Sequence, residues 1–303
     1  MQKNDIISGL EKGVEEKALC ANCGNVVEAH FCPHCGEKVL TDKDYSILHL
    51  VREGTEQLFD FDFKFLKTVG CLLGNPGYLT SEYWAGRRIR YTKPLQLLLL
   101  INIFYFFCSY VSSLLGNNIR VMFPTLGDIT GDRVFAHMAS EAVKAKIALM
   151  HIPAAAYYES FNIHLEQLAK SLVILLVPLL ALFLQVFYWR SKRFFVEHLI
   201  SAAHLVSFYV LFWSLFMLLL GGLTATFSHL FQAGQSLQGV LFPILRYLPA
   251  PVIGVYIFIA LKRVYKESLL VTLVKSALFI FFVIQAITNI YDFILFWAAY
   301  VLV

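Results

Sequence analysis

Long runs of apolar residues fill the sequence from Pro94 to its end, and short polar breaks separate them. A helix needs about 20 apolar residues to cross a hydrocarbon layer about 30 Å thick. The chain is 58% hydrophobic, whereas soluble globular domains are about 45–50% apolar. We therefore predict an all-α polytopic membrane bundle of residues 94–303 with about five spanning helices. The predicted spans are 95–115, 171–189, 199–220, 240–261 and 269–291.

The last apolar run, residues 269–303, is too long for one straight span at about 1.5 Å of rise per residue. We expect it to bend near Asn289 and Asp292, which would leave a terminal piece in the membrane interface. Gln285 shares a helical face with these two residues, and Lys275 lies deeper in the run. Hydrogen bonding between helices is the simplest role for this polar face.

Basic residues gather at three of the breaks between these runs. With five spans and an internal N-terminus, all three clusters lie on one side, which the positive-inside rule makes cytosolic. Residues 116–170 carry five basic and five acidic residues, and we expect a neutral, extracytoplasmic helical loop there. Residues 1–13 are polar and charged, so no secretory signal is expected. The basic clusters are Arg87, Arg88, Arg90 and Lys93, then Arg190, Lys192 and Arg193, then Lys262, Arg263 and Lys266.

Residues 41–93, before the first span, are expected to form cytosolic juxtamembrane amphipathic helices. Apolar residues recur every three or four positions from Leu58 to Leu72 and predict one helix. The sequence Gly-Asn-Pro-Gly at 74–77 should end it. A second short helix is expected to begin at Thr80 or Ser81. Such helices tend to lie in the membrane interface; the alternative is a soluble hairpin that covers the N-terminal unit.

Two Cys-x-x-Cys-Gly units, with eight residues between Cys23 and Cys32, are the most specific local pattern in the sequence. Zinc takes four thiolates at tetrahedral corners, and a unit this small depends on the metal for most of its folding energy. We predict that residues 1–40 form a cytosolic zinc ribbon with one structural Zn²⁺. Iron or a redox-active dithiol pair are alternatives, and His30 or His34 can replace a cysteine. The predicted ligands are Cys20, Cys23, Cys32 and Cys35.

The charge of this N-terminal unit argues against nucleic acid as its partner. Residues 1–40 carry four lysines and six acidic residues, whereas phosphate binding needs clustered positive charge. We expect a cytosolic protein partner, together with the lipid bilayer, and no nucleic acid. The sequence leaves the oligomeric state open.

Polar residues also cluster at the start of the third predicted span. Glu197, Ser201 and His204 recur at spacings of four and three and share one helical face, and His198 follows Glu197. Ionisable groups inside a membrane are costly and often functional, so this face can bind a metal, relay a proton or bond a neighbouring helix. The alternative is that Glu197 and His198 lie at the cytosolic interface and His204 is a hydrogen-bonded core residue. The two histidines lie about 240° apart around a helix, which disfavours a shared metal.

Four stretches of the chain together resemble a bacterial membrane family catalogued as domain of unknown function 3667. The resemblance implies a membrane protein with an N-terminal zinc ribbon and supplies no activity. A bacterial member with a cytosolic N-terminus is expected in the cytoplasmic (inner) membrane. Arg87 stands where a lysine is usual in similar chains. The four stretches are the cysteine units with Phe31, residues 75–77 with 86–91 and Pro94, residues 105–107, and Pro178 and Ala181 with 195–198 and His204.

No catalytic motif accompanies these features. The sequence contains no phosphate-binding loop, nucleophile elbow or His-Glu-x-x-His pair. The leading hypothesis is a non-enzymatic scaffold or regulatory protein whose zinc ribbon contacts a protein partner. A transporter or channel component that uses the polar faces of the third and fifth spans is the alternative. A membrane-embedded metalloenzyme at Glu197, His198 and His204 is the weakest reading.

Overall fold

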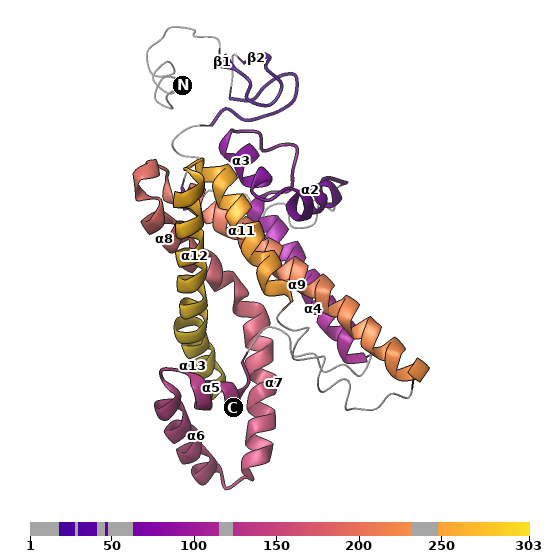
Figure 1. Ribbon diagram of the computed structural model, residues 1–303, viewed down its shortest axis with the longest axis vertical. Helices are drawn as coiled ribbons and strands as arrows, with labels where there is room; N and C mark the ends of the chain where they lie inside the picture. The colour runs from indigo at the N-terminus through magenta and orange to yellow at the C-terminus, as the bar shows by residue number, and fades with distance from the viewer. Residues whose placement is uncertain (1–17, 28–29, 41–45, 48–62, 115–123, 232–247) are drawn as a thin grey trace.

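The computed structural model describes residues 18–27, 30–40, 46–47, 63–114, 124–231 and 248–303. Within these ranges the chain is mostly helical, and a small unit with two short strands lies at its N-terminal end (Figure 1). The predicted fold class, an all-α membrane bundle preceded by a small four-cysteine unit, is confirmed.

Four helices in the described part of the chain are long and apolar enough to cross a membrane. They indicate a multi-pass membrane protein, as the apolar runs predict. Helices α4 and α9 pack along each other, and α8 packs along α9 on another side. In chain order the four are α4 (Pro94–Leu114), α7 (Ala154–Leu172) continued by α8 (Leu176–Phe187), α9 (Phe195–Phe231), and α12 (Leu269–Ala286) continued by α13 (Asp292–Leu302).

The predicted span 240–261 lies partly outside the described residues. Its described part belongs to α11 (Pro249–Tyr265), which has 17 residues and is about 26 Å long at 1.5 Å per residue. Helix α11 packs along α12 and carries Lys262 and Arg263 in its last turn. A fifth crossing at this place stays a prediction.

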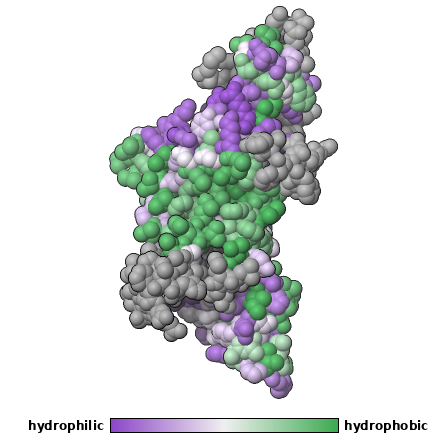
Figure 2. Space-filling view, turned by 90° about the vertical axis from the view of Figure 1, so that its right-hand side faces the viewer, coloured by the Kyte–Doolittle hydropathy of each residue, from purple (hydrophilic) through white to green (hydrophobic). Residues whose placement is uncertain are grey.

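Apolar side chains cover the middle of one face of the molecule. Figure 2 shows them as a green band, with purple, hydrophilic residues toward the end of the molecule that carries the cysteine unit. On α12, Leu269, Leu270 and Phe281 are more than half exposed although they are large and apolar. Soluble proteins rarely expose continuous apolar areas of this extent, so the band is the surface that contacts lipid.

The C-terminal apolar stretch is one helix with a π-helical turn, Ile287–Tyr291, at the place where a bend is predicted. Beyond the turn, α13 packs against α7 and buries Leu295, Phe296 and Ala299. Its first residue, Asp292, is buried and pairs with Arg133, which follows α5 (Leu126–Asp132). The terminal piece is therefore packed against helices of the 116–170 segment, which also contains α6 (Ala136–Met150).

Among the described residues, two helices precede the first span. They are α2 (Phe63–Gly74) and α3 (Tyr78–Trp84), and the expected part of the first helix before Phe63 lies outside the described residues. Helix α3 begins at Tyr78, slightly earlier than expected, because Gly77 adopts φ 72° directly before it.

These two helices pack directly on the membrane bundle. A Cβ atom at Gly77 would lie 2.7 Å from the carbonyl oxygen of Ala260 in α11, so only glycine permits this approach. The Tyr256 hydroxyl of α11 donates to the carbonyl of Leu72 in α2 (2.7 Å). Residues 63–84 are thus joined to α11 by contacts with backbone oxygen atoms. The apolar spacing that predicts these helices does not predict these contacts.

Candidate metal centre

The cysteine unit consists of two turns with the same backbone hydrogen bonds. In the first, the N–H of Cys20 donates to the carbonyl of Asn25 (2.8 Å) and the N–H of Gly24 donates to the carbonyl of Cys20 (2.9 Å). Gly24 adopts φ 78° and its counterpart φ 73°, a left-handed conformation that glycine adopts without strain. The residues that repeat both bonds in the second turn are Cys32, Gly36 and Glu37.

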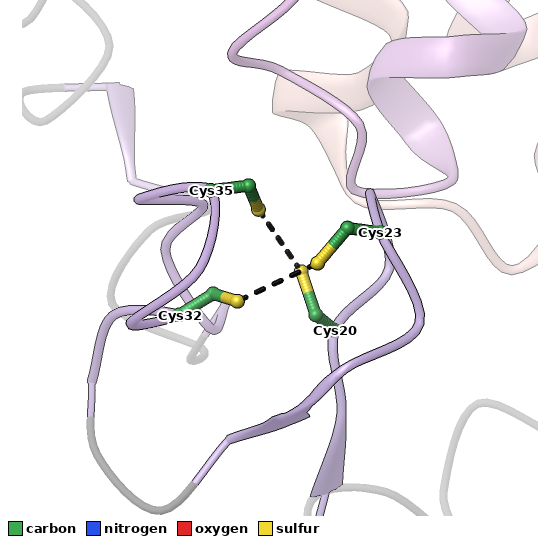
Figure 3. Close-up of side chains that lie close together, drawn as sticks. All are labelled: Cys20, Cys23, Cys32 and Cys35. Carbon is green, nitrogen blue, oxygen red and sulfur yellow. Dashed lines mark hydrogen bonds between the residues drawn. The ribbon is translucent and has the colours of Figure 1, made fainter.

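These turns bring the four predicted cysteine ligands together (Figure 3). The sulfur atoms of Cys20 and Cys35 are 3.5 Å apart, and those of Cys23 and Cys32 are 3.6 Å apart. All four sulfurs lie within 4.8 Å of one another. Sulfurs at tetrahedral corners about 2.3 Å from a zinc ion are about 3.8 Å apart, so the arrangement fits one tetrahedral metal ion.

The surroundings of the sulfurs favour the thiolate form at Cys35 but not at Cys23, whose pKa is raised because burial and the neighbouring thiols outweigh the backbone N–H of Asn25. The backbone N–H of Glu37 and the side chain of Asn22 lower the pKa of the Cys35 thiol to about 6. A thiol with this pKa is mostly deprotonated at neutral pH, and the thiolate is the form that binds metals. His30 and His34 are exposed and stand outside the cysteine group. The four cysteines can therefore complete a metal shell alone.

The second turn also holds the cysteine unit to the membrane-proximal chain. The Glu37 side chain is only 4% exposed, and its Oε2 accepts the backbone N–H groups of Arg88 and Ile89 at 3.1 Å each. Its counterpart in the first turn, Asn25, is exposed. The two turns thus have the same backbone hydrogen bonds. They differ at the position of Glu37, because only this side chain contacts residues 88 and 89.

Two further contacts join the same surfaces. The Arg90 guanidinium donates to the carbonyl of Asn22 (2.9 Å). Gly86 adopts φ 84°, and a Cβ atom there would lie 3.2 Å from the Cβ of Ala21. The loop 86–90 therefore contacts both turns of the cysteine unit and lies between that unit and α3.

The predicted polar face on α9 is buried, and its members have different partners. The Oε1 of Glu197 pairs with Arg193 (3.0 Å) and Oε2 accepts the N–H of Phe194 (3.0 Å), so this carboxylate caps the start of α9. The Ser201 hydroxyl donates to the carbonyl of Glu197. These contacts agree better with a structural role of Glu197 at the start of the helix than with a functional polar face.

The two histidines bond different helices. Nδ1 of His198 lies 2.6 Å from the hydroxyl of Tyr265 in α11, and Nδ1 of His204 lies 2.9 Å from the hydroxyl of Thr80 in α3. Among the described residues, the group with metal-binding geometry is the set of four cysteines. The histidines therefore give no support to a shared metal on α9. The Nε2 of His198 is buried and has no hydrogen-bond partner among the described residues.

Aromatic rings surround this end of α9. The ring of Tyr265 stacks on Tyr188 with centroids 3.5 Å apart, and Trp84 meets Tyr265 edge-on. The indole N–H of Trp84 donates to the carbonyl of Glu197 (3.1 Å), and Arg193 lies over its ring. Helices α3, α8, α9 and α11 meet here.

Sequence reasoning did not identify the partners of the cysteine unit and of the histidines. Glu37, Thr80 and Tyr265 are single polar residues without a motif around them. One signal was available for Glu37: it follows the second Cys-x-x-Cys-Gly where the first unit has Asn25. Tertiary packing brings Thr80 and Tyr265 to α9. The spacing of residues along the chain does not predict these contacts.

Residues 62–106 match the family described as "Protein of unknown function (DUF3667)". The predicted family is confirmed for this segment. The DUF3667 segment covers α2, α3, the loop 86–90 and residues 94–106 of α4. It therefore contains the residues that receive Glu37 and the residue that reaches His204. The cysteine unit lies before the match. Comparison with curated proteins and with solved structures gave no match.

Proposed function

We propose that this protein is a non-enzymatic scaffold or regulatory protein of the bacterial cytoplasmic membrane, with its N-terminus in the cytosol. Its four cysteines hold one structural zinc ion, and the resulting ribbon contacts a cytosolic protein. The observation that carries the proposal is the placement of the ribbon: one side is fixed on the membrane-proximal loop 86–90, and its outer residues are free to meet a partner.

Three of the exposed residues of the ribbon are large and apolar. Leu19 is 70% exposed and Phe31 is 57% exposed, and each directly precedes the first cysteine of its knuckle. Val26, which pairs with Leu19 across the two strands, is also exposed. Exposed apolar side chains that lie together on a small unit are typical of a surface that binds another protein. They therefore support a protein contact.

Zinc is the metal that the donor set favours. Four thiolates at tetrahedral spacing are typical of structural zinc, and a closed shell of four leaves no position for substrate. Iron in a rubredoxin-like site remains the alternative for the same ligands. The ribbon's role in this proposal is to fold and to present a surface.

Photo-crosslinking in intact membranes tests the partner surface. A photoreactive residue placed at position 19 or 31 is expected to give one discrete crosslinked protein. The same residue at Asn25 or Pro33, which are also exposed, serves as the control and is expected to give none. The same product from all four positions, or no product from any, would contradict the proposal.

Transport is the second candidate function, and the orphaned Nε2 of His198 is the observation that favours it. A buried, unpaired ring nitrogen at the polar end of α9 can exchange a proton or contact a solute. Purified protein in liposomes would then move an ion or solute, and His198→Ala would abolish the flux while a Phe208→Leu control would not. Absence of flux for the wild-type protein excludes transport by this chain alone.

A further inference from the structure

We propose that the ribbon is a metal-dependent clamp on the loop 86–90 and that Glu37 is the residue that closes it. This inference rests on metal binding by the four cysteines and is independent of which protein contacts the outer surface. It assigns a regulatory role to the metal: when the ion leaves, the ribbon releases the arginine-rich loop.

The position of Glu37 depends on the second knuckle. Its carbonyl accepts the N–H of Cys32 (2.8 Å), and its own N–H bonds the sulfur of Cys35. Both backbone polar groups of Glu37 therefore belong to the turn that the metal organises. Small four-cysteine units lose their fold when the metal is removed, so metal loss displaces Glu37.

The carboxylate of Glu37 satisfies groups that the loop cannot satisfy by itself. The amide of Arg87 donates to the carbonyl of Glu82 in α3 (3.0 Å), whereas the amides of Arg88 and Ile89 donate to Oε2 of Glu37. Charged acceptors make hydrogen bonds that are stronger than neutral ones.

The loop in turn is fixed to α3. Arg87 makes a bidentate pair with Glu82, with Nε 2.7 Å from Oε2. Arg88 lies over the ring of Tyr83, 4.3 Å from its centroid. Metal-dependent release therefore reaches the chain that directly follows α3, the helix that carries Thr80 and Trp84 onto α9.

The cysteine unit offers a matched control for this proposal. Asn25 occupies the position of Glu37 in the first knuckle, with the same backbone hydrogen bond to its cysteine, and its side chain is exposed. Replacing either residue by alanine leaves all four sulfurs and both turns. Only Glu37→Ala removes the acceptor of the loop amides.

Hydrogen–deuterium exchange of the full-length protein in detergent tests the clamp, with zinc content measured on each sample. In zinc-loaded protein we expect Glu37→Ala to speed exchange of the amides of Arg88 and Ile89 about tenfold or more, and Asn25→Ala to leave it unchanged. Removing zinc from the wild-type protein should give the same acceleration. Zinc removal should add little to Glu37→Ala.

Two results would overturn the clamp in different ways. If the wild-type protein binds no stoichiometric metal, the metal site itself is wrong. If it binds one zinc but loop exchange is the same in wild type, Glu37→Ala and metal-free protein, the site stands and the clamp is wrong. Restoration of slow exchange by Glu37→Gln, which keeps one acceptor oxygen, would support the direct contact.

Discussion

The hydroxyl of Thr80 in α3 lies 2.9 Å from Nδ1 of His204 in α9, and both side chains are buried. The residues are 124 positions apart, so this bond joins the chain before the first span to the third span. It gives His204, predicted as a candidate functional group, a structural partner from the DUF3667 segment.

Thr80→Val tests the value of this bond. Valine keeps the shape of threonine but leaves the buried nitrogen of His204 without a partner, which should cost about 1–3 kcal/mol of unfolding free energy. We expect a lower thermal midpoint in detergent. Thr130→Val is the control, because that hydroxyl bonds carbonyls of its own helix; equal loss in both variants would contradict the assignment.

Gly77→Ala tests the contact between α3 and α11. The left-handed φ of 72° costs a non-glycine residue about 1–2 kcal/mol, and the added Cβ would lie 2.7 Å from a backbone oxygen that cannot move alone. We expect a loss of more than 2 kcal/mol by denaturation in detergent. Gly70→Ala in α2, where a Cβ meets no described residue within 4 Å, should be neutral or stabilising; destabilisation of similar size would show that α3 is not seated as described.

Arg133→Met tests the ion pair at the opposite end of the molecule. Asp292 is 1% exposed, and removing the partner of a buried charge costs about 3–5 kcal/mol. Removing an exposed partner costs about 0–1 kcal/mol, so Lys144→Met, which breaks the exposed pair with Glu141, is the control. Thermal unfolding of both variants should separate them clearly, and similar midpoints would mean that Asp292 does not need Arg133.

The Glu82–Arg87 pair predicts a dependence of stability on pH. The hydrogen bond from Arg87 lowers the pKa of Glu82 below its ordinary value. The pair therefore stabilises the folded state above the ordinary carboxyl pKa, and this contribution is lost as pH falls through the lowered one. Arg87→Met should flatten the acid side of the stability curve, measured by unfolding at stepped pH, whereas Arg190→Met should not; an unchanged curve for Arg87→Met would contradict the pairing.

Much of this architecture is predictable from sequence because its causes are local. Apolar runs set the spanning helices, Gly-Asn-Pro-Gly at 74–77 separates α2 from α3, and two Cys-x-x-Cys-Gly turns place four sulfurs around one point. Each of these follows from residues close together in the chain, where spacing and backbone conformation decide the outcome.

The rest depends on contacts between distant segments. That α3 packs on α11 follows from the absence of a side chain at Gly77, and a glycine in a turn has several possible causes. The polar face on α9 reads as a possible site because spacing reveals that Glu197, Ser201 and His204 share a face. Spacing cannot reveal that Arg193 and Thr80 supply partners for the acid and the histidine.

The cysteine centre is the claim on which the proposed ribbon and its clamp depend, and element-resolved metal content of the purified full-length protein tests it most directly. The measurement compares wild type with Cys32→Ser/Cys35→Ser and with His198→Ala/His204→Ala. We predict one zinc per chain in wild type and in the histidine variant, and none in the cysteine variant. Metal that stays with the cysteine variant and leaves with the histidine variant would contradict the account and move the site to α9.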